Sequence, residues 1–132
     1  MENMKVHHVG YAVKKLEKAV EAFERLGYIS GDITEDTSRN IRIVFMENGH
    51  ERVELVTPNG VSTPVDGVLK NSGPTPYHIC YEVSDMPAAV NELKANGWMV
   101  IKEPTPAPAI GDALVTFLYN RHVGIIELVE IK

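Results

Sequence analysis

The sequence predicts an α+β protein that contains two copies of one structural unit. The stretch that begins at His8 returns at His78, 70 positions later (78 − 8), and this offset aligns further residues: Tyr11 with Tyr81, Val13 with Val83, Ala19 with Ala89, Val20 with Val90 and Gly27 with Gly97. Each copy passes from a strand pattern to the spacing of an amphipathic helix and back to strand patterns. Each copy also closes on a strand that carries a glutamate between apolar residues, at Glu54 and at Glu127. These observations predict a repeated unit of one strand, one helix and three strands.

The first copy has clear signals for the ends of its elements. Its helix is expected to end at Gly27, because glycine is favoured just past a helix C-terminus. The dipeptide Asn48-Gly49 is typical of a tight hairpin turn. The predicted elements are a strand at 5–13, a helix at 16–26, a strand from 28, a strand at 41–46 and its return at 53–56.

The second copy follows a short helix expected over 63–69 and a stiff linker at 72–76. Its own helix is expected to begin at Asp85, a good N-cap with Pro87 close to the first turn. The other predicted elements are strands at 76–83 and 98–101, a proline-rich loop at 104–112, and strands at 113–119 and 123–129. The loop either closes over a ligand, with Gly111 as its pivot, or is an inert connection.

Length and composition restrict the class of protein. A chain of 132 residues with 44% apolar and 23% charged residues is typical of one soluble globular domain. We expect this domain to span 1–132, with module one at about 5–57, a linker at about 58–75 and module two at about 76–131. No apolar run approaches the roughly 20 residues of a membrane-spanning helix, and no hydrophobic signal region is apparent, so a cytoplasmic protein without membrane contact is expected. The formal charge of −5 argues against nucleic-acid binding. A single cysteine, Cys80, excludes an internal disulfide and a thiolate-rich metal site.

Strand alternation predicts that two histidines and two glutamates share one side of the strands. Successive side chains of a strand point to opposite faces, and the helix covers the face with the apolar residues. His8 then lies on the face away from the helix, and His78 occupies the same place in the second copy. Glu54 and Glu127 interrupt the apolar pattern of the closing strands and point the same way.

These four residues suggest a metal site. A lone histidine in a strand is more often a hydrogen-bonded structural residue than a ligand. A carboxylate inside an apolar strand is harder to explain, because burying it without compensation is costly. We therefore hypothesise that His8, Glu54, His78 and Glu127 hold one divalent ion, and a set of nitrogen and oxygen ligands suits Ni, Co, Mn or Zn.

Four motifs surround the proposed ligands and run nearly end to end: His8-Val9-Gly10-Tyr11-Ala12-Val13, Arg52-Val53-Glu54-Leu55, His78-Ile79-Cys80-Tyr81-Glu82-Val83 and Gly124-Ile125-Ile126-Glu127-Leu128. They resemble the ligand strands of the vicinal oxygen chelate superfamily, which includes glyoxalase I, methylmalonyl-CoA epimerase, extradiol dioxygenases, and bleomycin and fosfomycin resistance proteins. The resemblance implies paired βαβββ modules that form a curved mixed sheet around a central metal-binding cleft. It also implies a small-molecule substrate and a homodimer, in which modules pair either within one chain or between chains.

The resemblance also implies a chemistry. Two histidines with two carboxylates fit the glyoxalase and epimerase types better than the dioxygenase or fosfomycin types, which use one carboxylate. In both fitting types a metal ion polarises a carbonyl while a carboxylate removes the proton on the neighbouring carbon. Glu127 is the expected base, and Glu54 is the second candidate.

The function expected from these arguments is that of a metal-dependent, glyoxalase I-like lyase. Its substrate would be the hemithioacetal formed by a thiol and a 2-oxoaldehyde, and an enediolate would be the intermediate. Two departures from the epimerase pattern favour this choice: the last turn, 117–124, lacks a His-Pro-Lys sequence, and the strand at 41–46 has no second carboxylate. The alternative is an isomerase like methylmalonyl-CoA epimerase that acts on an acyl-CoA, and a second alternative is a non-catalytic small-molecule binding or resistance protein.

Overall fold

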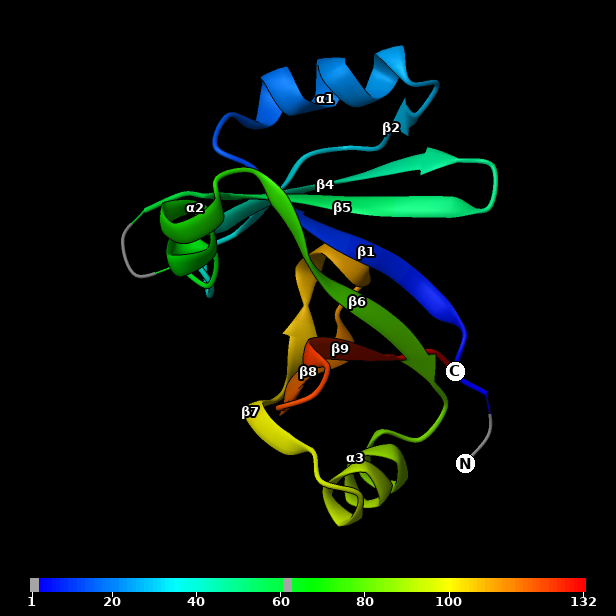
Figure 1. The fold of residues 1–132 in the computed structure, drawn as a ribbon. Helices are drawn as coiled ribbons and strands as arrows, with labels where there is room; N and C mark the ends of the chain where they lie inside the picture. Colours follow the sequence, from blue (N-terminus) through cyan, green and yellow to red (C-terminus); the bar gives the residue numbers. More distant parts are fainter. Residues whose placement is uncertain (1–2, 61–62) are drawn as a thin grey trace. The chain divides into compact units, whose positions relative to one another are not determined.

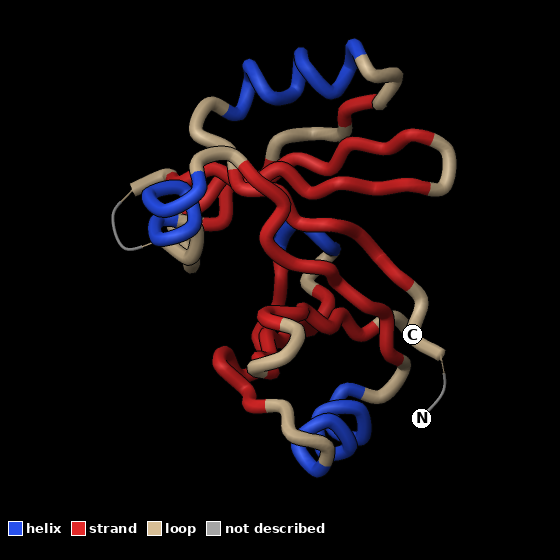
Figure 2. Tube along the Cα trace, in the orientation of Figure 1, coloured by secondary structure: helices blue, strands red, loops and turns tan. Residues whose placement is uncertain are grey.

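The protein is described here from a computed structural model, which covers residues 3–60 and 63–132. Within these residues it contains three α-helices and nine β-strands (Figures 1 and 2). The elements run in the order β1 (Val6–Ala12), α1 (Leu16–Arg25), β2 (Ile29–Ser30), β3 (Thr34–Asp36), β4 (Ile41–Asn48), β5 (Glu51–Pro58), α2 (Asp66–Ser72), β6 (Thr75–Val83), α3 (Met86–Ala95), β7 (Met99–Ala107), a 3-10 turn (Pro108–Ile110), β8 (Ala113–Asn120) and β9 (Gly124–Glu130). The predicted α+β class is confirmed.

The chain divides into two compact units. The first, called the His8 unit, comprises His8–Tyr77, and the second, called the His78 unit, comprises Met1–His7 together with His78–Lys132. The N-terminal segment joins the second unit through its backbone, because Lys5 O accepts a hydrogen bond from Glu82 N at 2.8 Å. Whether the two units act as one domain stays a prediction.

In the His8 unit, helix α1 covers one face of a small mixed sheet (Figure 1). Strand β1 runs parallel to β5, with Gly10 opposite Glu54, and β4 runs antiparallel to β5, with Phe45 also opposite Glu54. The short strands β2 and β3 both pair with β4. The core between helix and sheet consists of buried apolar side chains from α1, β4 and β5 and their neighbours: Val13, Leu16, Val44, Met46, Val53 and Leu55.

The His78 unit repeats this arrangement with α3 and the strand order β6-β9-β8-β7. Strand β6 runs parallel to β9, with Cys80 opposite Glu127, and β8 runs antiparallel to β9, with Phe117 also opposite Glu127. Helix α3 packs on one face of these strands, and the core there is again apolar: Val83, Met86, Ala89, Leu93, Leu118, Ile126 and Leu128.

The helix ends match the sequence signals. Asp85 is the N-cap of α3, and its side chain accepts a hydrogen bond from the backbone N–H of Ala88 at 3.1 Å. Gly27 and Gly97 follow α1 and α3 with φ of 102° and 93°, a conformation that side chains with a Cβ rarely adopt. Each glycine therefore ends its helix at the position that the repeat predicts.

Three elements differ from the prediction. Helix α2 spans Asp66–Ser72, later than the expected 63–69, and the extra strand β3 forms where a polar connection was expected. Strand β7 continues to Ala107, through the prolines that were expected to form a loop. Proline is tolerated here because β7 is an edge strand and its register with β8 shifts between Val100 and Lys102 and between Lys102 and Thr105.

Among the residues that the structure describes, no helix has the length and apolar character needed to cross a membrane.

Candidate metal and catalytic site

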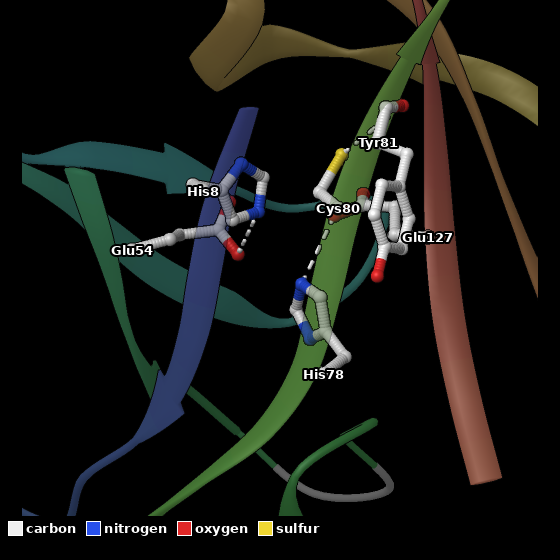
Figure 3. Close-up of polar contacts among 6 residues, drawn as sticks. All are labelled: His8, Glu54, His78, Cys80, Tyr81 and Glu127. Atoms are coloured by element: carbon white, nitrogen blue, oxygen red, sulfur yellow. Dashed lines mark hydrogen bonds and ion pairs between the residues drawn. The ribbon is translucent and has the colours of Figure 1, made fainter. Parts of the chain in front are cut away.

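The first histidine–glutamate pair lies in the His8 unit. His8 comes from β1 and Glu54 from the neighbouring strand β5. The parallel register places Gly10 opposite Glu54, and His8, two residues before Gly10, points to the same face. The Nε2 atom of His8 lies 3.4 Å from Oε1 of Glu54 (Figure 3). Both residues are buried, with exposed fractions of 1% and 6%. The core residues Val53 and Leu55 alternate with Glu54, so the carboxylate lies on the face away from α1.

The second pair repeats this geometry in the His78 unit. His78 comes from β6 and Glu127 from β9, and the Nε2 atom of His78 lies 3.0 Å from Oε1 of Glu127 (Figure 3). Both residues are 4% exposed. Ile126 and Leu128, on either side of Glu127, belong to the core under α3. Each unit therefore carries one buried pair on the side of its strands that the helix leaves free.

Each pair has an aromatic neighbour that the sequence reading missed. The ring of Phe45 meets the ring of His8 edge to face, with centroids 5.3 Å apart and planes at 72°. Phe117 meets His78 in the same way, at 5.4 Å and 87°. Both phenylalanines lie directly opposite the glutamate of their own unit. Each ring thus places an apolar neighbour beside the imidazole of its unit.

The donor atoms of each pair fit a divalent ion. Imidazole nitrogen and carboxylate oxygen are ligands for the transition metals and for zinc. Two donors that bind one ion at about 2.1 Å and at right angles lie about 3 Å apart, close to the 3.0 Å and 3.4 Å found here. The structure thus places the donors of each pair at a separation that one ion could bridge.

Other residues considered in the sequence occupy structural or surface positions. Cys80 is buried in an apolar cluster with Ala107, Val115 and Val129, which agrees with its expected role as a small hydrophobic residue. His50 and His122 are exposed.

Strand β4 carries a carboxylate that the sequence reading did not include. The strand extends to Asn48, two residues beyond the predicted end, and so contains Glu47. Glu47 lies opposite Arg52, and the Nε atom of Arg52 lies 3.0 Å from its Oε1. Both side chains share the strand face of Glu54, two positions further along.

Comparisons with known proteins connect this arrangement to acyl-CoA epimerases. The chain is 30% identical over 131 residues to the ethylmalonyl-CoA/methylmalonyl-CoA epimerase of Cereibacter sphaeroides, covering 96% of this chain and 98% of that protein. It is 32% identical to the mitochondrial methylmalonyl-CoA epimerase of Homo sapiens, covering 97% of this chain and 73% of that protein. The crystal structure of methylmalonyl-CoA epimerase from Mycobacterium tuberculosis matches with a TM-score of 0.85 at 25% identity, over 96% of this chain and 87% of that chain.

These relatives show that the prediction of a glyoxalase I-like lyase is wrong and favour the isomerase alternative. The prediction failed because the four motifs around the two pairs resemble both enzyme types and cannot separate them. Residues 121–123 form an exposed turn between β8 and β9, where a change of sequence has little effect on packing. Strand β4, which was expected to end at Met46 without a second carboxylate, ends at Asn48 and contains Glu47. Neither departure was therefore evidence against an epimerase.

The family itself is shown by a match over most of the chain. The sequence profile described as the Glyoxalase/Bleomycin resistance protein/Dioxygenase superfamily matches residues 7–117, which include β5, β6 and most of β1 and β8. The repeat, the two equivalent pairs and the relatives that match nearly the whole of this chain agree with this result. The chain belongs to the glyoxalase/bleomycin resistance protein/dioxygenase superfamily.

Proposed function

We propose that the protein is a divalent-metal-dependent epimerase of a 2-alkylmalonyl-CoA, with methylmalonyl-CoA as the first substrate to test. Two observations together support the proposal: similarity to epimerases of this class along nearly the whole of this chain, and two buried histidine–glutamate pairs. The proposed ligands are His8, Glu54, His78 and Glu127. The repeat supports a shared ion, because each unit alone supplies only two donors, fewer than catalytic zinc sites commonly use.

A bound divalent ion would supply positive charge that stabilises the negative charge developing on the thioester carbonyl oxygen of the substrate. The remaining work falls to the side chains of this chain. In a 2-alkylmalonyl thioester, carbon 2 lies between a thioester and a carboxylate, and its hydrogen is acidic because the carbanion delocalises into the thioester carbonyl.

Glu127 is the proposed base. Its carboxylate takes the proton from carbon 2, so the C–H bond breaks, an O–H bond forms on the carboxyl group and the electron pair moves into the thioester. Return of a proton to the opposite face of carbon 2 gives the epimer, and no other reactant is consumed. Glu54 is the second candidate for either transfer, because it occupies the same place in the other unit.

Solvent exchange tests the reaction directly. The protein, loaded with Co²⁺ or Mn²⁺, is incubated with one epimer of methylmalonyl-CoA in deuterium oxide, and the substrate is followed by mass spectrometry and chiral analysis. Formation of the other epimer with deuterium at carbon 2 supports the proposal. Failure of every divalent ion to produce exchange, in a protein that is folded, would rule out the epimerase.

We also propose that the protein is a homodimer, which sedimentation velocity tests. A mixing experiment then distinguishes pairing within a chain from pairing between chains. When His8→Ala and His78→Ala proteins are mixed and allowed to exchange subunits, pairing between chains restores about a quarter of wild-type activity, because half the dimers regain one intact site of two. Pairing within a chain restores none.

A further inference from the structure

The His78 unit exposes three apolar side chains in a row beside its histidine–glutamate pair. Ile125, Tyr119 and Met99 are 37%, 39% and 59% exposed. They come from three adjacent strands, because Tyr119 lies opposite Ile125 on β9 and opposite Met99 on β7. Side chains at directly opposed positions share one face of a sheet, so the three form a continuous surface, called here the apolar strip.

The apolar strip lies on the same face as Glu127. Ile125 precedes Glu127 by two residues on β9, and Tyr119 follows Phe117 by two residues on β8, so the side chains of each strand point the same way. Two residues of a strand span about 6.7 Å. Ile125, the first residue of the strip, therefore lies directly next to Glu127 on this face of β9. From Ile125 the strip continues across β8 to β7 at the edge of the sheet.

The corresponding positions of the His8 unit have a different character. There Arg52 precedes Glu54 by two residues, Glu47 lies opposite Arg52, and Ile29 lies opposite Glu47. Arg52 and Glu47 form an ion pair with a separation of 3.0 Å. The two units thus agree at the histidine, phenylalanine and glutamate but differ two positions further along, where one unit is charged and the other apolar.

We propose that the apolar strip binds the pantetheine arm of the CoA thioester. This inference rests on the proposed function. A thioester whose carbon 2 lies at Glu127 must lead its arm away over a neighbouring surface, and the arm carries methylene and gem-dimethyl groups that gain free energy when they cover apolar side chains. The strip offers such a surface beside the pair, whereas the two nearest positions of the His8 unit, Arg52 and Glu47, are charged.

A second copy of the chain is a weaker candidate for this surface. A stable interface buries about 800 Å² on each partner, and three partly exposed side chains supply only a fraction of that area. Single exposed hydrophobic residues are common on soluble proteins. The strip differs from them because its members are contiguous and continue directly from the buried pair.

The test compares a long ligand with a short one. Met99→Thr/Ile125→Thr shortens both ends of the strip with a residue that suits strands. The matched control is Ile29→Thr, which changes the counterpart of Met99 in the other unit, a side chain that is 77% exposed. Propionyl-CoA and propionyl-N-acetylcysteamine share the reacting end, but only the first has the full arm. Dissociation constants are measured by NMR titration, which covers micromolar and millimolar affinities.

The expected result is a loss of about tenfold in affinity for propionyl-CoA in the double variant, since burial of a few methyl groups contributes that much. Affinity for the short thioester changes less than twofold, and Ile29→Thr matches the wild type with both ligands. Equal losses for both ligands, or no loss for either, would overturn the proposal. So would a dimer that dissociates in the double variant while the affinity ratio is unchanged, because the strip would then be a subunit contact.

The binding measurement separates this proposal from the proposed function. Binding needs no turnover, so a tenfold loss confined to propionyl-CoA supports the strip even if the wild type shows no proton exchange, a result that would reject only the epimerase. Proton exchange with an unaltered affinity ratio rejects only the strip. No binding of propionyl-CoA by the wild-type protein rejects both.

Discussion

The Nε2 atom of His78 lies 3.0 Å from the Oε1 atom of Glu127, and the two side chains are 0% and 6% exposed. At this separation the imidazole and the carboxylate form a hydrogen bond. A divalent ion would replace that contact with bonds to both donors. Binding of the ion and folding are then coupled, because an ion that binds only the folded chain stabilises it.

Removal of metal is therefore expected to lower stability. After treatment with a chelator the melting temperature should fall. Adding back a divalent ion at about a hundred times its dissociation constant should raise the free energy of unfolding by about 2.7 kcal/mol. Differential scanning calorimetry measures the change. In His78→Ala the metal should change the melting temperature little. In His122→Ala, which changes an exposed histidine, the metal should raise the melting temperature as it does in the wild type. Equal stabilisation of both variants would contradict the assignment of His78 as a ligand.

Glu127 and Glu54 should differ in proton transfer. Glu127→Gln keeps an oxygen donor but loses the basic carboxylate, and solvent exchange at carbon 2 should fall by about 10²–10⁴-fold. In Glu54→Gln the rate of solvent exchange should fall by a smaller factor. Deuterium uptake into methylmalonyl-CoA gives the two rates, and melting temperatures with and without metal report whether each variant still binds the ion. A larger loss in Glu54→Gln would exchange the roles of the two residues.

The N-terminus of α1 lacks a feature that α3 has. Lys15 is the N-cap of α1, with φ of −123° and ψ of 102° and no side-chain cap, whereas Asp85 caps α3 at the matching position of the repeat. Lys15→Asp should raise the free energy of unfolding by about 1 kcal/mol and the melting temperature by about 4 °C, through a hydrogen bond to the first turn and a favourable interaction with the helix dipole. Urea unfolding measures the gain. Lys14→Asp is the control, and a gain there as large as at Lys15 would indicate a net-charge effect instead.

Asp36 should make stability depend on pH. Burial would raise the pKa of its carboxyl group, but hydrogen bonds from Ser38 and Arg39 and the charge of Arg39 outweigh this and hold the pKa below its usual value. A carboxyl group whose pKa is lower in the folded state adds stability above its unfolded pKa of about 3.9, and this stability is lost as the pH falls through the folded pKa.

Asp36→Asn should thus lower the free energy of unfolding by about 1–3 kcal/mol at pH 7, because charged hydrogen bonds of a buried group are lost. The difference from the wild type should shrink as the pH falls below about 4. Urea unfolding at several pH values gives both quantities, with Asp32→Asn at an exposed position as the control. A difference that is the same at pH 7 and pH 3 would show that the charge of Asp36 does not contribute.

Much of the fold was predictable because local signals repeat at one offset. Gly27 and Gly97 end the helices, Asp85 caps α3, and the alternation around Glu54 and Glu127 assigns their face. The extent of β7 was not predictable, since the prolines read as a loop and only its position at the sheet edge makes them acceptable in a strand.

The surroundings of the pairs were harder to predict than the pairs themselves. Phe45 and Phe117 are 72 positions apart, so the offset of 70 that aligns the histidines does not align them. Their contacts with the imidazoles depend on the register of β4 with β5 and of β8 with β9. Register is set by pairing across the sheet, which one strand's sequence does not specify. The roles of the four proposed ligands and of the proposed base stay predictions.

The ion pair between Arg52 and Glu47 in one unit, and the apolar residues at the matching places of the other, make the neighbourhoods of the two histidine–glutamate pairs chemically unequal. Two identical modules would offer a ligand the same neighbourhood twice. In modules that differ, an apolar group of a ligand would gain more free energy beside the His78–Glu127 pair than beside the His8–Glu54 pair, because covering Arg52 and Glu47 would remove water from charged groups.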